Sequence, residues 1–365
     1  MVTPSGSLEK DFDTSHPAEG DVDGDTSQPR GNATRRSPLP LTPASHDDQE
    51  DDFSQRMART QASRQERLKE MCAKYQPSVA NQEDDFSQRM ARTQASRQER
   101  LKEMCAKYQP SVANQVPSRV HVWRVYTEDR SKLLYCEVPK VGCSNWKRVF
   151  MVLGGSATDI GEIAHNAAHN SLNKHRLDRF NSTGIAERLR AYTKFLFVRE
   201  PFERVVSAFR DKFENPNSYY HPVFGRPIIR RYRANASRDA LLTGAGVTFR
   251  EFVQYLVDAH RPVGMDIHWE PSNKLCRPCL LHYDFIGKFE NMEEEANFLL
   301  QKIGAPVNLR FPHFKDRDPL AERTSSRITD SYMAQLNTTE RQKLYDFYSM
   351  DYLMFNYLKP IKDLN

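Results

Sequence analysis

Two short segments of the chain carry residues suited to binding anions. The first, "VPKVGCSNWKR" (138–148), follows the apolar run "KLLYCE" and places Lys140, Gly142 and Ser144 or Asn145 ahead of an apolar-periodic segment. A strand, a tight loop and a helix N-terminus bind anions because the loop amides and the helix dipole both favour negative charge. The GxxxxGK[ST] spacing is absent, which argues against an ATP or GTP hydrolase. A capped helix with an exposed lysine is the alternative.

The second segment, "FLFVREPFERVVSAFRDKFE" (195–214), places an arginine at the carboxyl end of an apolar run. Pro201 suits the first position of a helix, and Ser207 then lies about two turns into it. Arg199 can bind a phosphate with two hydrogen bonds, while Ser207 can donate a third. An ion pair of Arg199 with Glu200 or Glu203 is the alternative. Two separate anion grips suit a ligand with phosphates at both ends.

The surrounding pattern predicts the elements that hold these segments. Apolar runs at 132–138, 192–198 and 283–290 predict buried strands. Helical periodicity follows at 145–154, at 201–215, at 291–303 before Gly304, and at 339–357 with Thr339 and Gln342 at capping-box spacing. The alternation predicts an α/β fold with a central, largely parallel sheet flanked by helices. Ligands of such sheets bind at the carboxyl ends of the strands.

The N-terminal third has a different texture. Residues 1–48 are rich in Asp, Ser, Pro and Gly without hydrophobic periodicity, which predicts disorder. Residues 49–81 recur unchanged at 82–114, and each copy carries an amphipathic stripe (Leu68, Met71, Cys72 and Tyr75 in the first). We expect the two helices to end at Pro77 and Pro110 and to form a stem, with a single catalytic domain at 115–365.

Composition restricts the class of protein. The 365 residues carry a net charge of +5, and because residues 1–48 are acidic, the basic excess lies in the predicted folded part and favours anionic ligands. No apolar run is long enough to span a membrane, and no signal peptide is visible. Four glycosylation sequons indicate the secretory pathway, at Asn32, Asn181, Asn235 and Asn337.

The two anion-binding segments closely resemble those of the Golgi carbohydrate sulfotransferases that act on chondroitin, dermatan and terminal N-acetylgalactosamine (GalNAc). The resemblance runs from about Val120 to Leu358 and includes "NSYYHPVFGRPI", "PVGMDIHWEP" and "LCRPCLLHYDFIGKFENM". Within this family the chain is most similar to the 4-O-sulfotransferases of terminal GalNAc. The resemblance implies a P-loop-like sulfotransferase fold, 3'-phosphoadenosine 5'-phosphosulfate (PAPS) as sulfuryl donor, a GalNAc-containing acceptor and no metal.

The resemblance also implies which residues of this chain contact the donor, position by position. The 5'-phosphosulfate contacts implied by the resemblance are Pro139, Lys140, Val141, Gly142, Cys143, Ser144 and Asn145. The 3'-phosphate contacts are Arg199, Glu200, Pro201, Phe202, Glu203, Arg204, Val205, Val206 and Ser207. Lys140 is the expected catalytic cation, because sulfuryl transfer needs stabilisation of spread negative charge.

The acceptor hydroxyl needs a general base, and histidine is the commonest choice. We expect His268 of "DIHWEP" to be this base, with Glu270 as its rival and His221 of "YYHPVF" as the other family-like histidine. Lys147 and Arg148 are expected to be solvated. Four aromatic side chains either stack on sugar or adenine or simply pack in the core or at its rim: Tyr219, Tyr220, Trp146 and Trp269. Two basic side chains of "FKDRD" either contact the nucleotide or are exposed loop charges: Lys315 and Arg317.

The cysteines and the family resemblance also predict disulfides and a cellular location. Cys276 and Cys279 form C-x-x-C without a second pair nearby, which argues against a four-cysteine zinc site; a disulfide with Cys136, with Cys143 or with each other is expected in the Golgi lumen. The resemblance implies a type II Golgi membrane protein, although no anchor is visible and the stem unit is doubled. The stem also offers a route to a homo-oligomer.

Alternatives remain open at this stage. The acceptor could be chondroitin or dermatan. A nucleic-acid or heparin-binding module would explain the basic charge, although the resemblance implies no nucleic-acid partner. A catalytically silent glycan-binding protein is the third reading, and intact Lys140, Arg199 and Ser207 count against it.

Overall fold

The computed structural model describes residues 46–112, 114–313 and 322–360. Disorder was expected for residues 1–48. Residues 1–45 lie outside the described residues, whereas residues 46–48 belong to helix α1 (His46–Tyr108). The chain divides into two compact units, Met1–Ala73 and Lys74–Asn365. In the first unit, the described side chains of residues 55–72 are exposed.

The second unit is built on a four-stranded mixed sheet in the order β1–β2–β3–β4. The strands are β1 (Val125–Glu128), β2 (Leu133–Cys136), β3 (Thr193–Val198) and β4 (Phe285–Lys288). The last three are parallel, whereas β1 pairs antiparallel with β2. The three predicted strands are confirmed in type and place, and β1 was not predicted. The fold is therefore α/β with a largely parallel sheet, as expected.

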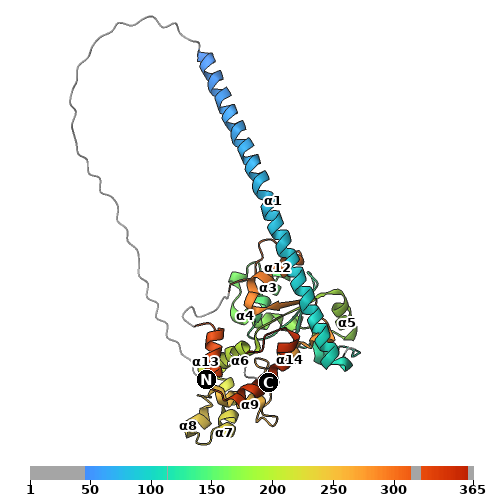
Figure 1. The fold of residues 1–365 in the computed structure, drawn as a ribbon, viewed down its shortest axis with the longest axis vertical. Helices are drawn as coiled ribbons and strands as arrows, with labels where there is room; N and C mark the ends of the chain where they lie inside the picture. The colour runs from blue at the N-terminus through green and yellow to red at the C-terminus, as the bar shows by residue number, and fades with distance from the viewer. Residues whose placement is uncertain (1–45, 113, 314–321, 361–365) are drawn as a thin grey trace, which may run out of the picture. The chain divides into compact units, whose positions relative to one another are not determined.

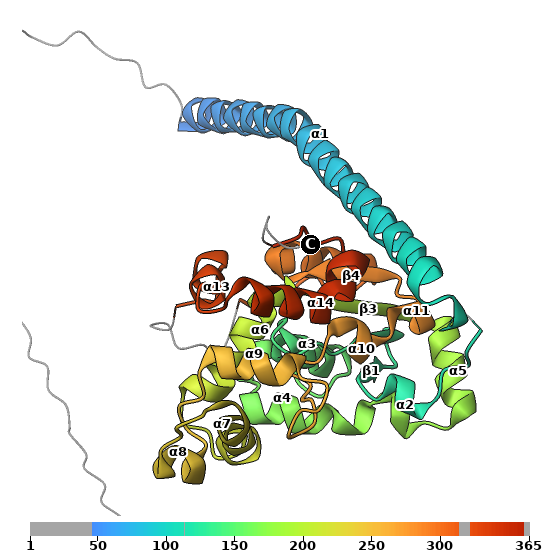
Figure 2. The ribbon, with the colours of Figure 1, turned by 60° about the horizontal axis from the view of Figure 1, so that its bottom comes forward.

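Helices cover this sheet, and their residues form two hydrophobic clusters. The α-helices of the second unit after α1 are α2 (Arg119–Val122), α3 (Cys143–Leu153), α4 (His165–Ser171), α5 (Ser182–Ala191), α6 (Pro201–Phe209), α7 (Arg226–Tyr232), α8 (Arg238–Thr243), α9 (Phe249–Val257), α10 (Ser272–Cys276), α11 (Pro278–Leu281), α12 (Met292–Lys302), α13 (Ser326–Met333) and α14 (Thr338–Met354). One cluster contains the sheet with α3 and α12, and the other contains α6, α7, α9 and α14. Figure 2 shows α7, α8 and α9 grouped at one end of this unit and α2 and α5 at the other.

Several predicted helix boundaries are wrong. Helix α1 continues through Pro77 and ends at Tyr108, just before Pro110, so only the second predicted stop is confirmed. A proline inside a helix removes one hydrogen bond without ending the helix when the neighbouring turns hold. Helix α14 begins with a capping box of Asn337 and Glu340, two residues before the predicted one. Helix α6 is followed by a π-turn at 210–214, within the predicted helical span.

The C-terminal part of α1, from Lys74 onward, belongs to the second unit and packs along the open edge of β4. Gln94 donates to the carbonyl of Ile286 (3.1 Å) and accepts from its amide (2.9 Å), so this side chain takes the place of a neighbouring strand. Arg97 makes two bonds to the buried carboxylate of Glu295, at 2.6 and 2.8 Å. Figure 1 shows this part of α1 passing beside α12. The second repeat copy is therefore part of the folded unit.

Two disulfides join distant parts of this unit. Cys136 of β2 bonds to Cys276, one of the pairings expected from the sequence, whereas Cys279 bonds to Cys105 of α1, a partner that was not expected. The C-x-x-C pair therefore forms no bond of its own, because its two sulfurs face different elements. Cys72 and Cys143 are free.

Candidate active site

A cavity of about 590 Å³ opens where the parallel strands β2 and β3 end. It gathers residues from both predicted anion loops, from the "DIHWEP" segment and from α4. Its lining includes Pro139, Lys140, Gly142, Cys143, Ser144, Asn145, His165, His169, Arg199, Ser207, Arg210, Asp211, Lys212, Asn215 and His268. Segments far apart in the chain therefore meet at one polar site.

The first loop enters this cavity through left-handed backbone. Lys140 and Gly142 both have positive φ, 70° and 69°, and Gly142 is the residue before the first turn of α3. A Cβ on Gly142 would lie 3.2 Å from the side chain of Met292, so glycine satisfies both the conformation and the close packing. The helix begins at Cys143, with Gly142 as its N-cap residue, so neither Ser144 nor Asn145 caps it. Because Cys143, Ser144 and Asn145 line the cavity, the N-terminal end of the helix and its dipole lie at the cavity wall.

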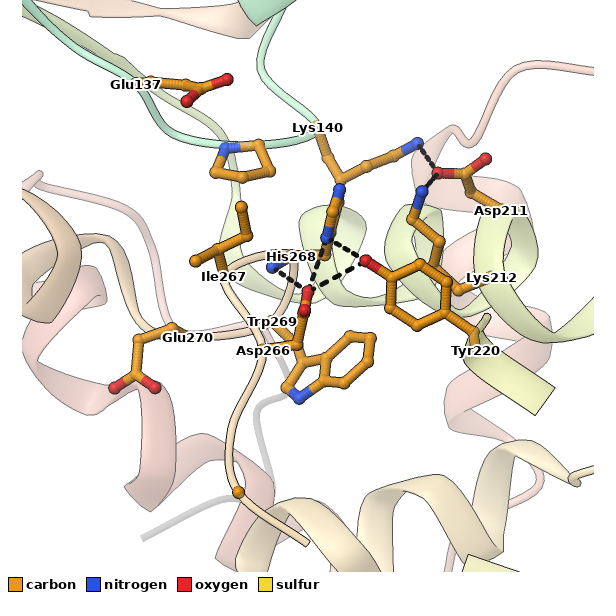
Figure 3. Close-up of polar contacts among 12 residues, drawn as sticks. Glu137, Lys140, Asp211, Lys212, Tyr220, Asp266, Ile267, His268, Trp269 and Glu270 are labelled. Carbon is orange, nitrogen blue, oxygen red and sulfur yellow. Dashed lines mark hydrogen bonds and ion pairs between the residues drawn. The ribbon is translucent and has the colours of Figure 1, made fainter. Parts of the chain in front are cut away.

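Lys140 is held by an acidic residue of the π-turn that follows α6. Its Nζ lies 3.0 Å from Asp211 Oδ2, and Lys212 Nζ lies 3.0 Å from the same oxygen (Figure 3). Burial disfavours the charged form of Asp211, but the two lysines outweigh it and lower its pKa to about 2. The site thus has two cations sharing one carboxylate.

Arg199 also lines the cavity, at the end of β3, and is almost fully buried, with 5% of its surface exposed. Its guanidinium donates to the carbonyl of Thr324 (2.6 Å), pairs with Glu203 at 3.3 Å and stacks over the ring of Phe289. Among the described residues, its Nε has no hydrogen-bond partner. The ion pair of Arg199 with Glu203, which was the alternative interpretation of this segment, is therefore formed, and one buried donor beside the cavity is not satisfied by it.

The other residues of the second segment have different positions. Arg204 is 1% exposed and donates to the carbonyls of Pro139, Ile267 and Glu270, so it ties together the loops that form the cavity. Glu200 caps α6 through the amide of Glu203. Several predicted contacts lie in the hydrophobic core, namely Val141, Pro201, Phe202, Val205 and Val206.

His268 reaches the cavity from the loop before α10, with a carboxylate behind it. Its Nδ1 lies 2.6 Å from Asp266 Oδ1 and 2.9 Å from the hydroxyl of Tyr220 (Figure 3). Burial lowers the pKa of His268 despite its hydrogen bond to Asp266, which acts in the opposite direction. With Nδ1 engaged, Nε2 is the nitrogen left to act on a substrate.

The rivals of His268 lie elsewhere. His221 is buried and stacks on Phe213, while Glu270 does not line the cavity. Trp146 and Trp269 are fully buried core residues, Tyr220 hydrogen-bonds His268, and only Tyr219 is exposed. Lys315 and Arg317 lie outside the described residues.

The expected solvation of Lys147 and Arg148 is wrong. Lys147 is 4% exposed and pairs with Glu137 at 2.8 Å, and Glu137 also pairs with Arg124. Arg148 is fully buried and donates to Asn145 Oδ1 and to the carbonyl of Ile163. Both lie on the face of α3 that packs on neighbouring elements, where buried acceptors stabilise their charges.

Sequence reasoning missed several residues of the site. Asp211 and Lys212 lie in the second segment beyond Ser207, and Asp266 precedes His268 by two residues; this D-x-H spacing was the one available signal. His169 of α4 lies 2.9 Å from Ser144, and nothing in the pattern of "HNAAHN" indicated it. Only packing of α4 against α3 brings it to the cavity.

Other expectations concern the surface. The described sequons, Asn181, Asn235 and Asn337, are all exposed, whereas Asn32 lies outside the described residues. No helix in the described ranges is long and apolar enough to cross a membrane. Within residues 46–360, leaving aside the two undescribed gaps, no group of three or more acidic, histidine or cysteine side chains is arranged to hold a metal ion.

Comparisons with known proteins agree with this geometry. The model of the sulfotransferase family matches residues 123–358. The chain is 65% identical to carbohydrate sulfotransferase 8 of Mus musculus over 244 residues, covering 67% of this chain and 58% of that protein. It is 60% identical to carbohydrate sulfotransferase 9 of Homo sapiens (66% and 54%) and 44% identical to carbohydrate sulfotransferase 11 of Mus musculus (65% and 67%).

The matched region thus spans little more than half the length of the first two relatives. No solved structure matches the chain significantly. The family match covers well over half of the chain, including both anion loops and the His268 segment. The chain belongs to the sulfotransferase family.

Proposed function

We propose that this protein transfers a sulfuryl group from PAPS to a carbohydrate hydroxyl, the 4-OH of terminal GalNAc on glycoprotein glycans. The observation that carries the proposal is the single cavity that joins Lys140 at the end of β2, Arg199 at the end of β3 and His268. Relatives named carbohydrate sulfotransferase support the acceptor class.

The residues present fit a donor with two separated anionic groups. The segment from Pro139 to Asn145 would hold the 5'-phosphosulfate, through Lys140 and through the backbone amides at the start of α3. Arg199 and Ser207 would hold the 3'-phosphate. The buried Arg199 Nε, which has no partner in the described part of the chain, is the donor that such an anion would satisfy. Glu200, Glu203 and Arg204 support this grip by shaping α6 and its loops.

In the transfer step, His268, Asp266 and Lys140 each have one role. His268 accepts the proton of the acceptor hydroxyl on Nε2 while Asp266 holds Nδ1. The acceptor oxygen forms the new bond to sulfur as the bond between sulfur and the 5'-phosphate oxygen breaks. Lys140 stabilises the negative charge that grows on the leaving phosphate.

Labelled-sulfate transfer tests this function. The full chain, secreted from a eukaryotic host, is incubated with PAPS carrying radioactive sulfate and with GalNAc-terminated glycan, desulfated chondroitin or desulfated dermatan. We expect label on the first acceptor. Label on chondroitin or dermatan would overturn the acceptor assignment. Binding of polyanions without PAPS selectivity, or PAPS binding without transfer to any acceptor, would contradict the enzymatic proposal.

Lys140→Ala should remove most turnover, by about 100-fold or more, because it deletes the cation at the leaving group. The matched control is Lys174→Ala, an exposed lysine outside the cavity, which should leave turnover unchanged. Turnover of Lys140→Ala close to that of the unmodified chain would refute its catalytic role.

His268→Gln should lower turnover by about 100-fold and remove the acidic limb of the pH–rate profile. A base must be neutral, so activity of the unmodified chain should fall as the pH drops through the pKa of His268, which burial lowers. His260→Gln, at an exposed histidine, is the control. A pH profile that His268→Gln leaves unchanged would rule out this base.

We further propose residence in the Golgi lumen, membrane association and N-glycosylation at the exposed sequons. Two disulfides in a unit of this size suit an oxidising compartment. The Oδ1 atoms of Asn181 and Asn337 accept helix-capping bonds, which leaves each Nδ2 for a glycan. A mass shift on glycosidase treatment of the secreted chain tests this, and sedimentation tests a homo-oligomer through the stem.

A further inference from the structure

His169 connects the first anion loop to a buried ionic cluster. Its Nε2 lies 2.9 Å from Ser144 Oγ, and its Nδ1 lies 3.3 Å from Lys147 Nζ. Ser144 and His169 both line the cavity, whereas Lys147 is buried behind them. The histidine thus stands between a hydroxyl that faces the ligand space and an ammonium that does not.

The cluster behind His169 fixes which ring nitrogen carries the proton. Burial disfavours charge on both Lys147 and Glu137. Glu137 outweighs this effect for Lys147 and raises the pKa of that ammonium, whereas Arg124 and then Lys147 outweigh it for Glu137 and lower the pKa of that carboxyl. A charged ammonium can only donate, so Nδ1 of His169 must accept. Burial, and then Lys147, lower the pKa of His169 to about 4, so the ring is neutral at luminal pH and its single proton lies on Nε2.

This tautomer determines what Ser144 offers to the cavity. Nε2–H donates to Ser144 Oγ, which occupies a lone pair of the hydroxyl and leaves its hydrogen free to be donated. A phosphosulfate group carries only acceptor oxygens at neutral pH. A serine whose hydrogen was committed to an imidazole acceptor would present a lone pair to that anion and repel it.

We propose that His169 is a positioning residue for the donor: as a relay from Lys147, it holds Ser144 so that its hydroxyl donates to the phosphosulfate. The inference rests on the proposed PAPS site and adds a residue from α4 to it. His169 itself does not touch the reacting atoms. Glutamine at this position would reproduce the relay, since its Oε1 accepts from Lys147 while its Nε2 donates to Ser144; leucine would abolish it.

A double-mutant cycle on the full chain tests the relay. PAPS binding is measured by calorimetry for the unmodified chain, Ser144→Ala, His169→Leu, the double variant and His169→Gln. We expect each of the first two changes to weaken binding about tenfold, the size of one hydrogen bond to a charged group. The double variant should be no weaker than either single variant, and His169→Gln should stay within about twofold of the unmodified chain.

Steady-state kinetics supply a second readout. The KM for PAPS should rise in His169→Leu while the KM for the glycan acceptor stays unchanged, a division that general loss of structure would not produce. Should His169→Leu lower the melting temperature, His169→Gln is compared with His169→Asn, whose shorter side chain cannot reach both partners.

Three outcomes would overturn the relay: additive losses of about 100-fold in the double variant, PAPS affinity unaffected by His169→Leu, or a glutamine variant as weak as the leucine variant. An unmodified chain that binds no PAPS would overturn the proposed function and the relay together. Normal PAPS binding by the unmodified chain, together with additive losses of affinity in the double variant, would refute the relay and leave the proposed function in place.

Discussion

The two copies of the 33-residue repeat have the same sequence and opposite surroundings. In the first copy Met57, Leu68 and Met71 are 47%, 69% and 58% exposed; their counterparts Met90, Leu101 and Met104 are 5%, 5% and 3% exposed. Both copies are helical. An amphipathic stripe therefore encodes the helix and a face able to pack, but a surface that fits this face decides whether it is buried.

The second copy shows what that surface requires. Its stripe is not purely apolar: Gln94 completes the open edge of β4, and Arg97 neutralises the buried Glu295. The corresponding Gln61 and Arg64 are exposed. Identical side chains thus have a structural role in one copy and a solvated one in the other, which gives each change in the second copy a matched control in the first.

Truncation should give the largest effect. Residues 74–365 retain the second copy and should keep the unfolding midpoint of the full chain. Residues 115–365 lose Leu101, Met104 and the bond of Cys105 to Cys279, so we expect destabilisation of about 5 kcal/mol or more, comparable with the whole stability of many domains. Urea unfolding of both fragments measures this. Equal stability of the two fragments would show that the second copy is only a spacer.

The next effect concerns the buried ion pair. Arg97→Ala leaves the carboxylate of Glu295, 2% exposed, without its partner, and should cost about 3–5 kcal/mol. Arg64→Ala removes the same side chain from an exposed position and should change stability by less than about 0.5 kcal/mol. Chemical denaturation of the two variants compares them. Equal losses would mean that the first copy is also packed in solution.

Substitution of the two equivalent cysteines of the repeat should give a somewhat smaller difference in the free energy of unfolding. Cys105→Ser removes a disulfide that spans 174 residues, and we expect a loss of about 2–4 kcal/mol. Cys72→Ser alters an exposed free thiol and should leave stability unchanged. Thermal unfolding under oxidising conditions measures both, and thiol alkylation follows Cys279. If Cys279 stays protected in Cys105→Ser, another thiol has replaced Cys105 and the two copies are less distinct than the structure shows.

Some residues of the candidate site could be predicted from local sequence pattern, whereas others reach the site only through packing. The loop of Lys140 and Gly142 and the strand end at Arg199 were predicted because the strand, loop and helix signals are local. His268 was predicted from its surroundings. Asp211, Asp266 and His169 were not, because a carboxylate or histidine gains its role from a partner that the fold brings to it.

The sequence by itself determined the alternation of strands and helices, the two anion loops at strand ends and the helical nature of both repeat copies, since these follow from periodicity and from turn residues along the chain. Only the tertiary structure decided which repeat copy is buried, which cysteine meets Cys279, and that Lys147 lies buried against Glu137. Burial, disulfide pairing and charge pairing depend on contacts between residues 100 or more positions apart or on which face of a helix meets a neighbour, and no local pattern specifies those contacts.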